Sequence, residues 1–153
     1  ADLRDQVAAL QALGPDRLSN LFVVDRIELV SLTGGADYDG VPGDDGVTVY
    51  LRPVDADGNV LKAAGEIIIE LLDTSVPGAP RSLGQYIHND PEQLRKLWYS
   101  GIWTDHYTIR CAWSPDAGKP RSREVLVKAN FNDFLTGRRF TAAKLINVSL
   151  AGE

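Results

Sequence analysis

The chain is poor in the residues that build most catalytic and metal centres. It has one cysteine, Cys111, no methionine, and only two histidines, His88 and His106. A single thiol excludes an intrachain disulfide, and a zinc site needs three or four converging nitrogen or sulfur ligands. The sequence also lacks a Gly-x-Ser-x-Gly elbow, a phosphate-binding glycine loop and a His-Glu-x-x-His motif. We therefore expect a non-catalytic protein.

The chain also lacks a basic excess and a long apolar run, which bear on binding to nucleic acid and to membranes. The 153 residues carry 16 lysines and arginines against 21 aspartates and glutamates, for a net charge of −5. Without a basic excess, nucleic acid is not an expected partner. The longest apolar run, residues 67–69, is far short of the roughly 20 residues that span a bilayer. We expect no membrane span within this chain.

The first fifteen residues predict a helical lead-in. Leu3, Val7 and Leu10 follow the i, i+4, i+7 spacing of a coiled-coil seam, and Gly14 and Pro15 end the pattern. Such a helix could be the end of a stalk that begins upstream of Ala1, or it could pack on its own domain. The absence of an initiator methionine favours a processed or longer chain. We expect two parts, a lead-in over residues 1–15 and a β domain over residues 20–151.

After residue 20 the apolar pattern changes from a helical period to a period of two, which indicates strands. An N-cap residue in Asn89-Asp90, then Pro91 at the first helical position and the acidic Glu92 in the first turn, predict one short helix over residues 91–98. Together these patterns predict a mostly β fold: an antiparallel, immunoglobulin-like β-sandwich with a short N-terminal helix and one short crossover helix. About seven strands are expected, at residues 22–32, 47–51, 66–73, 82–87, 106–113, 124–133 and 140–150.

Residues 34–46 form the most unusual segment, with five glycines and four aspartates in thirteen positions. Glycine weakens regular structure and aspartate bonds its own backbone in turns, so a structured loop or bulge is expected. Carboxylates suit calcium, but the spacing is not that of an EF-hand. The alternatives are Asx-turns within the loop or contact with a partner. The candidate calcium ligands are Asp37, Asp39, Asp44 and Asp45.

A second acidic turn follows the second expected strand. Asp55, Asp57 and Asn59 occupy positions 1, 3 and 5 of an EF-type loop, and Glu66 occupies position 12. Position 6 is Val60, where the EF-hand requires glycine. A β-hairpin turn explains the same residues more simply.

Aromatic residues concentrate between residues 98 and 113. Alternation places Tyr107 and Trp113 in the core, together with Cys111, which we expect to be a small buried hydrophobe. Trp98, Tyr99 and Trp103 fall in the connection before this strand. They either cap one end of the sandwich or stack on the sugar rings of a polysaccharide.

One stretch resembles a known group. Residues 26–73 contain Leu-Thr-Gly-Gly, then Asp-Tyr-Asp-Gly-Val-Pro-Gly-Asp-Asp-Gly, then Val-Tyr-Leu-Arg-Pro-Val-Asp-Ala-Asp-Gly-Asn. This pattern is similar to uncharacterised secreted or lipid-anchored bacterial envelope proteins of the planctomycete type. The resemblance implies a coiled-coil lead-in before a β-sandwich, at the periplasm or cell surface. It implies no activity, cofactor or site residue.

These observations lead to one main expectation and two alternatives. We expect a structural or protein-interaction module of the bacterial cell envelope, able to self-assemble through its N-terminal helix or its sheet edges. The first alternative is a carbohydrate-binding module that uses Trp98, Tyr99 and Trp103. The second is a calcium-stabilised adhesion domain that uses the 34–46 loop.

Overall fold

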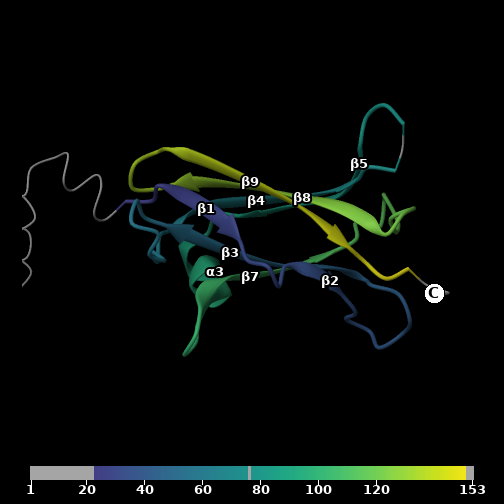
Figure 1. The fold of residues 1–153 in the computed structure, drawn as a ribbon, viewed down its shortest axis with the longest axis horizontal. Helices are drawn as coiled ribbons and strands as arrows, with labels where there is room; N and C mark the ends of the chain where they lie inside the picture. The colour runs from purple at the N-terminus through teal and green to yellow at the C-terminus, as the bar shows by residue number, and fades with distance from the viewer. Residues whose placement is uncertain (1–22, 76, 151–153) are drawn as a thin grey trace, which may run out of the picture.

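The computed structural model describes residues 23–75 and 77–150, and these form two stacked antiparallel sheets with one short helix (Figure 1). The expected N-terminal helix over residues 1–15 lies outside the described residues. Within the described ranges no helix is long and apolar enough to cross a membrane. The elements are β1 (Arg26–Leu29), β2 (Gly34–Ala36), β3 (Gly46–Val54), β4 (Gly65–Asp73), β5 (Arg81–His88), α3 (Pro91–Leu97), β6 (Trp98–Ser100), β7 (Asp105–Ala112), β8 (Glu124–Asp133) and β9 (Arg139–Asn147).

Each sheet has a simple order. Sheet A runs β1-β3-β7-β6, and β2 also pairs with β3. Sheet B runs β5-β4-β8-β9. The apolar strand β4 lies between β5 and β8, which confirms the central position that its sequence predicts. The chain therefore has a mostly β, sandwich-like architecture, whereas the finer immunoglobulin-like assignment stays a prediction.

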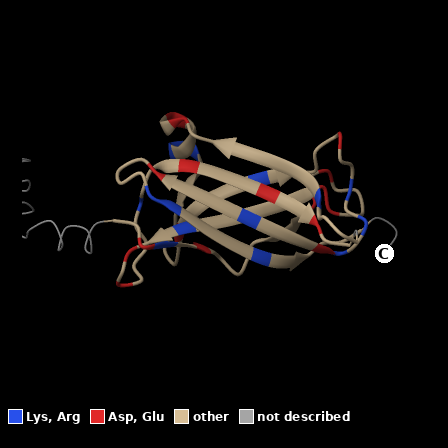
Figure 2. Ribbon diagram, turned by 90° about the horizontal axis from the view of Figure 1, so that it is seen from above, with Lys and Arg blue, Asp and Glu red and all other residues tan. Residues whose placement is uncertain are grey.

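The core lies between the sheets and is built mainly by alternation. On β4 and β8 every second side chain is buried, and β3 and β7 follow the same pattern except near their ends, where adjacent residues are both buried. Burying one such aliphatic side chain stabilises the fold by about 1.5–3 kcal/mol. The outer face of sheet B carries the remaining positions of its strands. Figure 2 shows that lysine, arginine, aspartate and glutamate residues are distributed along several strands and do not form one cluster. The fully buried aliphatic side chains include Val47, Val49, Leu51, Ile67, Ile69, Leu71, Leu83, Ile109, Val125 and Val127.

The described part of the chain holds nine strands, not about seven. The two additional strands, β2 and β6, have three residues each, too short for a period of two to appear in the sequence. Strand β2 also corrects the expectation that the glycine-rich segment contains no regular strand. Gly35 pairs with Val47, and a Cβ added at Gly35 would lie 2.1 Å from Asp44 Oδ2. A Cβ at Gly46 would lie 2.2 Å from the Cys111 carbonyl oxygen. Glycine permits close approach here.

The crossover helix is confirmed as α3, which ends at Leu97. Its N-cap is Asp90, whose carboxylate accepts a hydrogen bond from the Glu92 N–H, and Pro91 begins the first turn. Basic residues Arg95 and Lys96 lie in the last turn, where they favour the helix dipole. The chain then turns directly into β6, the edge of sheet A.

Candidate functional site

The 34–46 loop brings three of its four aspartates together. Ligand oxygens of Asp37, Asp39 and Asp45 lie within 4.8 Å of one another at the surface. Each carboxylate also accepts hydrogen bonds from loop amides. Asp45 Oδ2 accepts from the N–H groups of Tyr38 at 2.8 Å and Asp39 at 3.1 Å, and Asp37 Oδ1 accepts from the Gly40 N–H at 2.9 Å. The bond from the Tyr38 N–H lowers the pKa of Asp45. The Asx-turn alternative is therefore confirmed, and the Oδ1 of Asp45 accepts no hydrogen bond from the described loop amides.

Asp44, the fourth expected calcium ligand, has a different role. Its Oδ2 accepts a hydrogen bond from the Ser149 N–H at 2.7 Å, and its N–H donates to the Ser149 carbonyl at 2.8 Å. Its carbonyl accepts from the Trp113 indole N–H at 2.8 Å. Asp44 thus joins the loop to the chain after β9 and to the end of β7. A calcium site in this loop would be formed by Asp37, Asp39 and Asp45.

The second acidic turn is a turn between the sheets rather than an EF-type loop. Asp55 Oδ1 accepts hydrogen bonds from the N–H groups of Asp57 and Asn59 at 3.0 and 2.9 Å. Gly58 has φ of +83°, as tight turns require. Glu66 instead accepts from the Asn132 side-chain amide at 3.0 Å on the outer face of sheet B. The simpler turn interpretation is correct.

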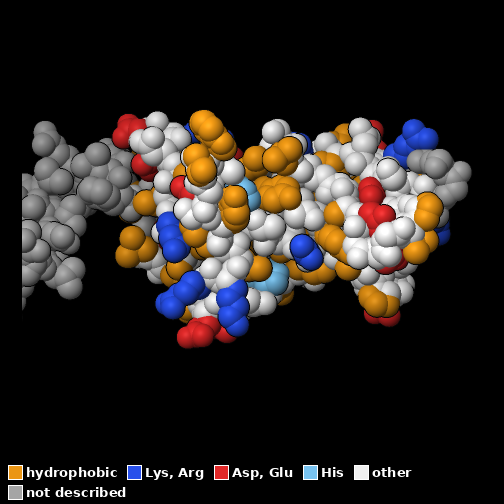
Figure 3. Space-filling view, turned by 90° about the horizontal axis from the view of Figure 1, so that it is seen from below, with side chains coloured by type: hydrophobic (Ala, Val, Ile, Leu, Met, Phe, Trp, Pro, Cys, Tyr) orange, Lys and Arg blue, Asp and Glu red, His pale blue; other side chains and the backbone are white. Residues whose placement is uncertain are grey.

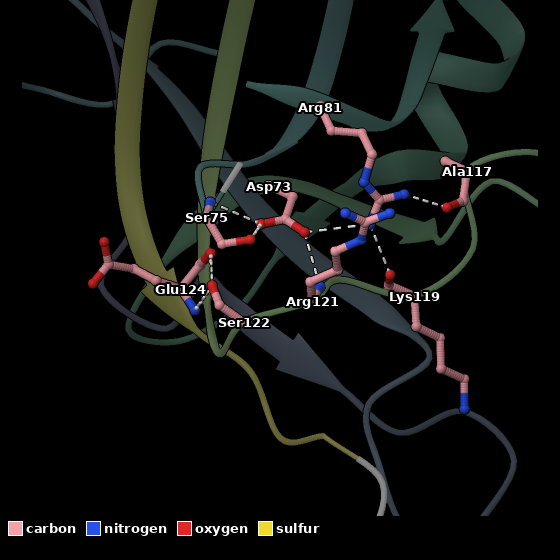
Figure 4. Close-up of polar contacts among 8 residues, drawn as sticks. All are labelled: Asp73, Ser75, Arg81, Ala117, Lys119, Arg121, Ser122 and Glu124. Atoms are coloured by element: carbon pink, nitrogen blue, oxygen red, sulfur yellow. Dashed lines mark hydrogen bonds and ion pairs between the residues drawn. The ribbon is translucent and has the colours of Figure 1, made fainter. Parts of the chain in front are cut away.

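The most highly bonded carboxylate belongs to Asp73, which our sequence analysis did not single out (Figure 4). Its side chain is fully buried. Oδ1 accepts from the N–H and hydroxyl of Ser75 at 3.0 and 2.6 Å, and Oδ2 accepts from the Arg121 N–H at 2.8 Å. The Arg81 guanidinium lies 3.3 Å from Oδ2 and also donates to the carbonyls of Ala117 and Lys119.

This network is structural. Burial by itself would raise the pKa of Asp73, but the hydrogen bonds from Arg121, Ser75 and Arg81 lower the pKa to about 2. Asp73 therefore stays ionised and connects the end of β4 to two loops. Alternation could have indicated its burial, because Asp73 shares the inward face of β4 with Ile67, Ile69 and Leu71.

The three aromatic residues expected to bind sugar do not form one platform. Trp98 and Tyr99 are neighbours on β6, so their side chains point to opposite faces of the sheet. Trp98 is half-buried and contacts the Tyr107 ring edge-on at 4.9 Å, whereas Tyr99 stacks on His106 at 5.2 Å. Trp103 lies in the following turn with 94% of its surface exposed. Only Tyr99 belongs to the outer face of sheet A.

Cys111 and His106 are both packed within the fold. Cys111 is fully buried, and burial raises the pKa of its thiol to about 12. His106 is buried between Tyr99 and Tyr50, and its Nδ1 lies 3.2 Å from the Thr108 hydroxyl oxygen. A thiol kept protonated is a poor nucleophile.

An apolar groove of about 400 Å³ opens at the end of the molecule where the described chain begins. Its walls include Val23, Val24, Leu61 and Ala63. The β8–β9 turn completes it with two side chains that are largely exposed, Phe134 at 52% and Leu135 at 77%. We call this feature the end groove. No sequence period indicates it, because its walls come from three separate segments.

No protein-family model matches this sequence, and no curated protein matches it.

Proposed function

We propose that this protein is a non-catalytic interaction module that assembles with other copies of itself. The end groove carries the proposal. It is apolar, its rim exposes Phe134 and Leu135, and its first wall residue is Val23, directly after the N-terminal segment. Exposed apolar patches of this kind are typical of protein contact sites.

The occupant that we propose is residues 1–13 of a second copy. Leu3, Val7 and Leu10 provide an apolar stripe of a size that suits a groove. The buried Cys111, with its raised thiol pKa, supports the non-catalytic part of the proposal.

The test is the solution mass of the full chain by light scattering. We expect an oligomer that becomes monomeric in a Leu3→Ser/Val7→Ser/Leu10→Ser variant and in a Phe134→Ser/Leu135→Ser variant. Leu32→Ser is the matched control, because Leu32 is 75% exposed but does not line the groove. A monomeric parent chain would contradict the proposal, and so would an oligomer that survives both variants.

We also propose an envelope location, at the periplasm or cell surface. The support is the sequence resemblance of residues 26–73 to secreted and lipid-anchored proteins. In the source cells, fractionation should recover the protein with the envelope, and recovery in the cytosolic fraction would contradict this location.

A second candidate function is calcium-stabilised adhesion. The specific observation is the convergence of Asp37, Asp39 and Asp45 within 4.8 Å. Calcium takes six to eight oxygen ligands, which three carboxylates and water can supply. The test is the melting temperature in calcium and in chelator, described with the predictions below.

A further inference from the structure

The outer face of sheet A contains a polar hollow of about 360 Å³ that lies apart from the end groove. We call it the sheet A hollow. Its floor consists of two cross-strand pairs, Tyr50 with Thr108 and Thr48 with Arg110, from the neighbouring strands β3 and β7. The residues between them, such as Val49 and Ile109, are fully buried, so the floor side chains share the outward face.

One wall of the hollow comes from the loop after β2. Tyr38 lies against the floor, with its hydroxyl oxygen 3.1 Å from Thr48 Oγ1 and its ring centre 5.8 Å from the Arg110 guanidinium carbon. Asp37 also lines the hollow, and its Oδ1 is held by the Gly40 N–H. Loop and floor are therefore positioned before any ligand arrives.

The lining identifies the chemical class of the ligand. Of the seven residues that line the hollow, only Ala36 has no polar group on its side chain. Two tyrosine rings, two threonine hydroxyls and one guanidinium can contact the flat C–H faces and the hydroxyl groups of a pyranose ring. A peptide anchor would require a more apolar pocket. Arg110 and Asp37 contribute opposite charges, which favours a neutral ligand over an anion.

The surface also extends beyond one sugar ring. Thr108 and Arg110 also line a second hollow of about 470 Å³, together with Tyr99 and Lys96. The rest of its lining is His88, Leu97, Trp98 and Ile109, so this hollow reaches inward at the β6 edge as well as along the outer face. Tyr99 stacks on His106, and His106 contacts Tyr50 edge-on at 4.9 Å, so aromatic rings continue from β3 to β6. Figure 3 shows this side of the molecule, where hydrophobic side chains lie near the histidines and acidic side chains lie toward both ends. From the loop after β2 to β6 the surface crosses three strand spacings, roughly 14 Å.

We propose that the outer face of sheet A is a binding site for a neutral linear polysaccharide, with Tyr38, Tyr50 and Arg110 as the contacting residues. Tyr99 extends the site toward β6. This assignment is independent of self-assembly, since none of these residues lines the end groove. It also places sugar binding away from Trp103, which lines neither hollow.

The experiment is titration of the full ¹⁵N-labelled chain with cellohexaose, N-acetylated chitohexaose and xylohexaose, followed by NMR. We expect at least one of these to shift the amides of Tyr38, Thr48 and Arg110 at millimolar concentration or below. Arg110→Gln and Tyr50→Ala should each weaken that binding at least tenfold. Arg110 is exposed, so we expect Arg110→Gln to keep the fold and to test the site even if Tyr50→Ala unfolds.

Trp103→Ala is the control and should leave binding unchanged, because Trp103 lines neither hollow. Three results would overturn the proposal: no binding of any of the three hexasaccharides, shifts confined to the end groove, or loss of binding in Trp103→Ala with no change in Arg110→Gln. Binding of a peptide library at the hollow without any hexasaccharide binding would assign the site to a protein partner instead.

Discussion

Asp73 and Asp45 both lie at strand ends and accept hydrogen bonds from loop amides. They differ in whether a carboxylate oxygen is left to bind a cation. Both oxygens of Asp73 are bonded, its side chain is fully buried, and Arg81 lies beside it. Asp45 uses Oδ2 for two amides and lies at the surface beside Asp37 and Asp39. A carboxylate whose two oxygens are both bonded holds the fold together, whereas one with a free oxygen beside other carboxylates can receive a cation.

The largest effect is expected when the buried carboxylate of Asp73 is removed. Asp73→Ala should lower the free energy of unfolding by about 3 kcal/mol, because it leaves Arg81 and buried donors without their acceptor. Asp57→Ala is the control, since Asp57 is exposed, and should change the free energy by less than about 0.5 kcal/mol. Urea denaturation measures both. Equal changes in the free energy of unfolding for the two variants would mean that the hydrogen bonds of Asp73 do not stabilise the fold.

The pH dependence should separate Asp73 from the surface aspartates. The pKa of Asp73 is about 2 in the folded chain, below the value of about 3.9 in an unfolded chain. Its contribution, about 2 kcal/mol, is therefore present above pH 4 and is lost as the pH falls from about 4 to about 2. Asp73→Asn should flatten the stability profile in that window. A variant profile parallel to that of the parent chain would contradict the assignment.

Calcium should raise the melting temperature through the surface group that contains Asp45, and not through Asp73. If the Asp37, Asp39 and Asp45 group binds calcium with a dissociation constant of about 1 mM, then 10 mM calcium stabilises the fold by about 1.4 kcal/mol. The melting temperature should rise by about 3–5 °C over that in chelator. Asp45→Asn should abolish the rise, and Asp44→Asn should preserve it. An identical melting temperature in calcium and chelator would remove this function.

The smallest expected effect concerns Asp44, which belongs to the acidic loop but resembles Asp73 in its role. Asp44→Ala should cost about 1 kcal/mol, because the Ser149 N–H loses its acceptor. Hydrogen exchange at Ser149 should become faster, while exchange on the central strand β4 stays unchanged. Unaltered protection of Ser149 would show that the backbone bonds of Asp44 hold this contact without the carboxylate.

Strong local patterns made parts of the fold predictable. Strand β8 was expected over residues 124–133 and has those bounds, since its alternating apolar residues face a continuous core. Helix α3 was expected because the N-cap residue Asp90 precedes Pro91 and Glu92 lies in the first turn. In contrast, β2 and β6 have no detectable period, and they pair only because β3 and β7 present free edges.

The candidate sites were less predictable than the strands. Composition indicated the acidic loop, but not that Asp44 leaves the group to bind Ser149. Aromatic residues close in sequence suggested a platform at Trp98, Tyr99 and Trp103, although alternation separates the first two across a sheet. The sheet A hollow combines residues 36–50 with residues 108 and 110, a separation that no local pattern reveals.

The amino-acid sequence by itself determined the strand-rich character of the chain, the inward faces of its long strands and the position of its one described helix. Those features follow from the period of the apolar residues and from capping, both of which act over a few neighbouring residues. Only the tertiary structure decided that Thr48 lies opposite Arg110, that Asp73 meets Arg81 and Arg121, and that Phe134 and Val23 share a groove. Those contacts depend on strand register and loop closure, which are set by the packing of the whole chain.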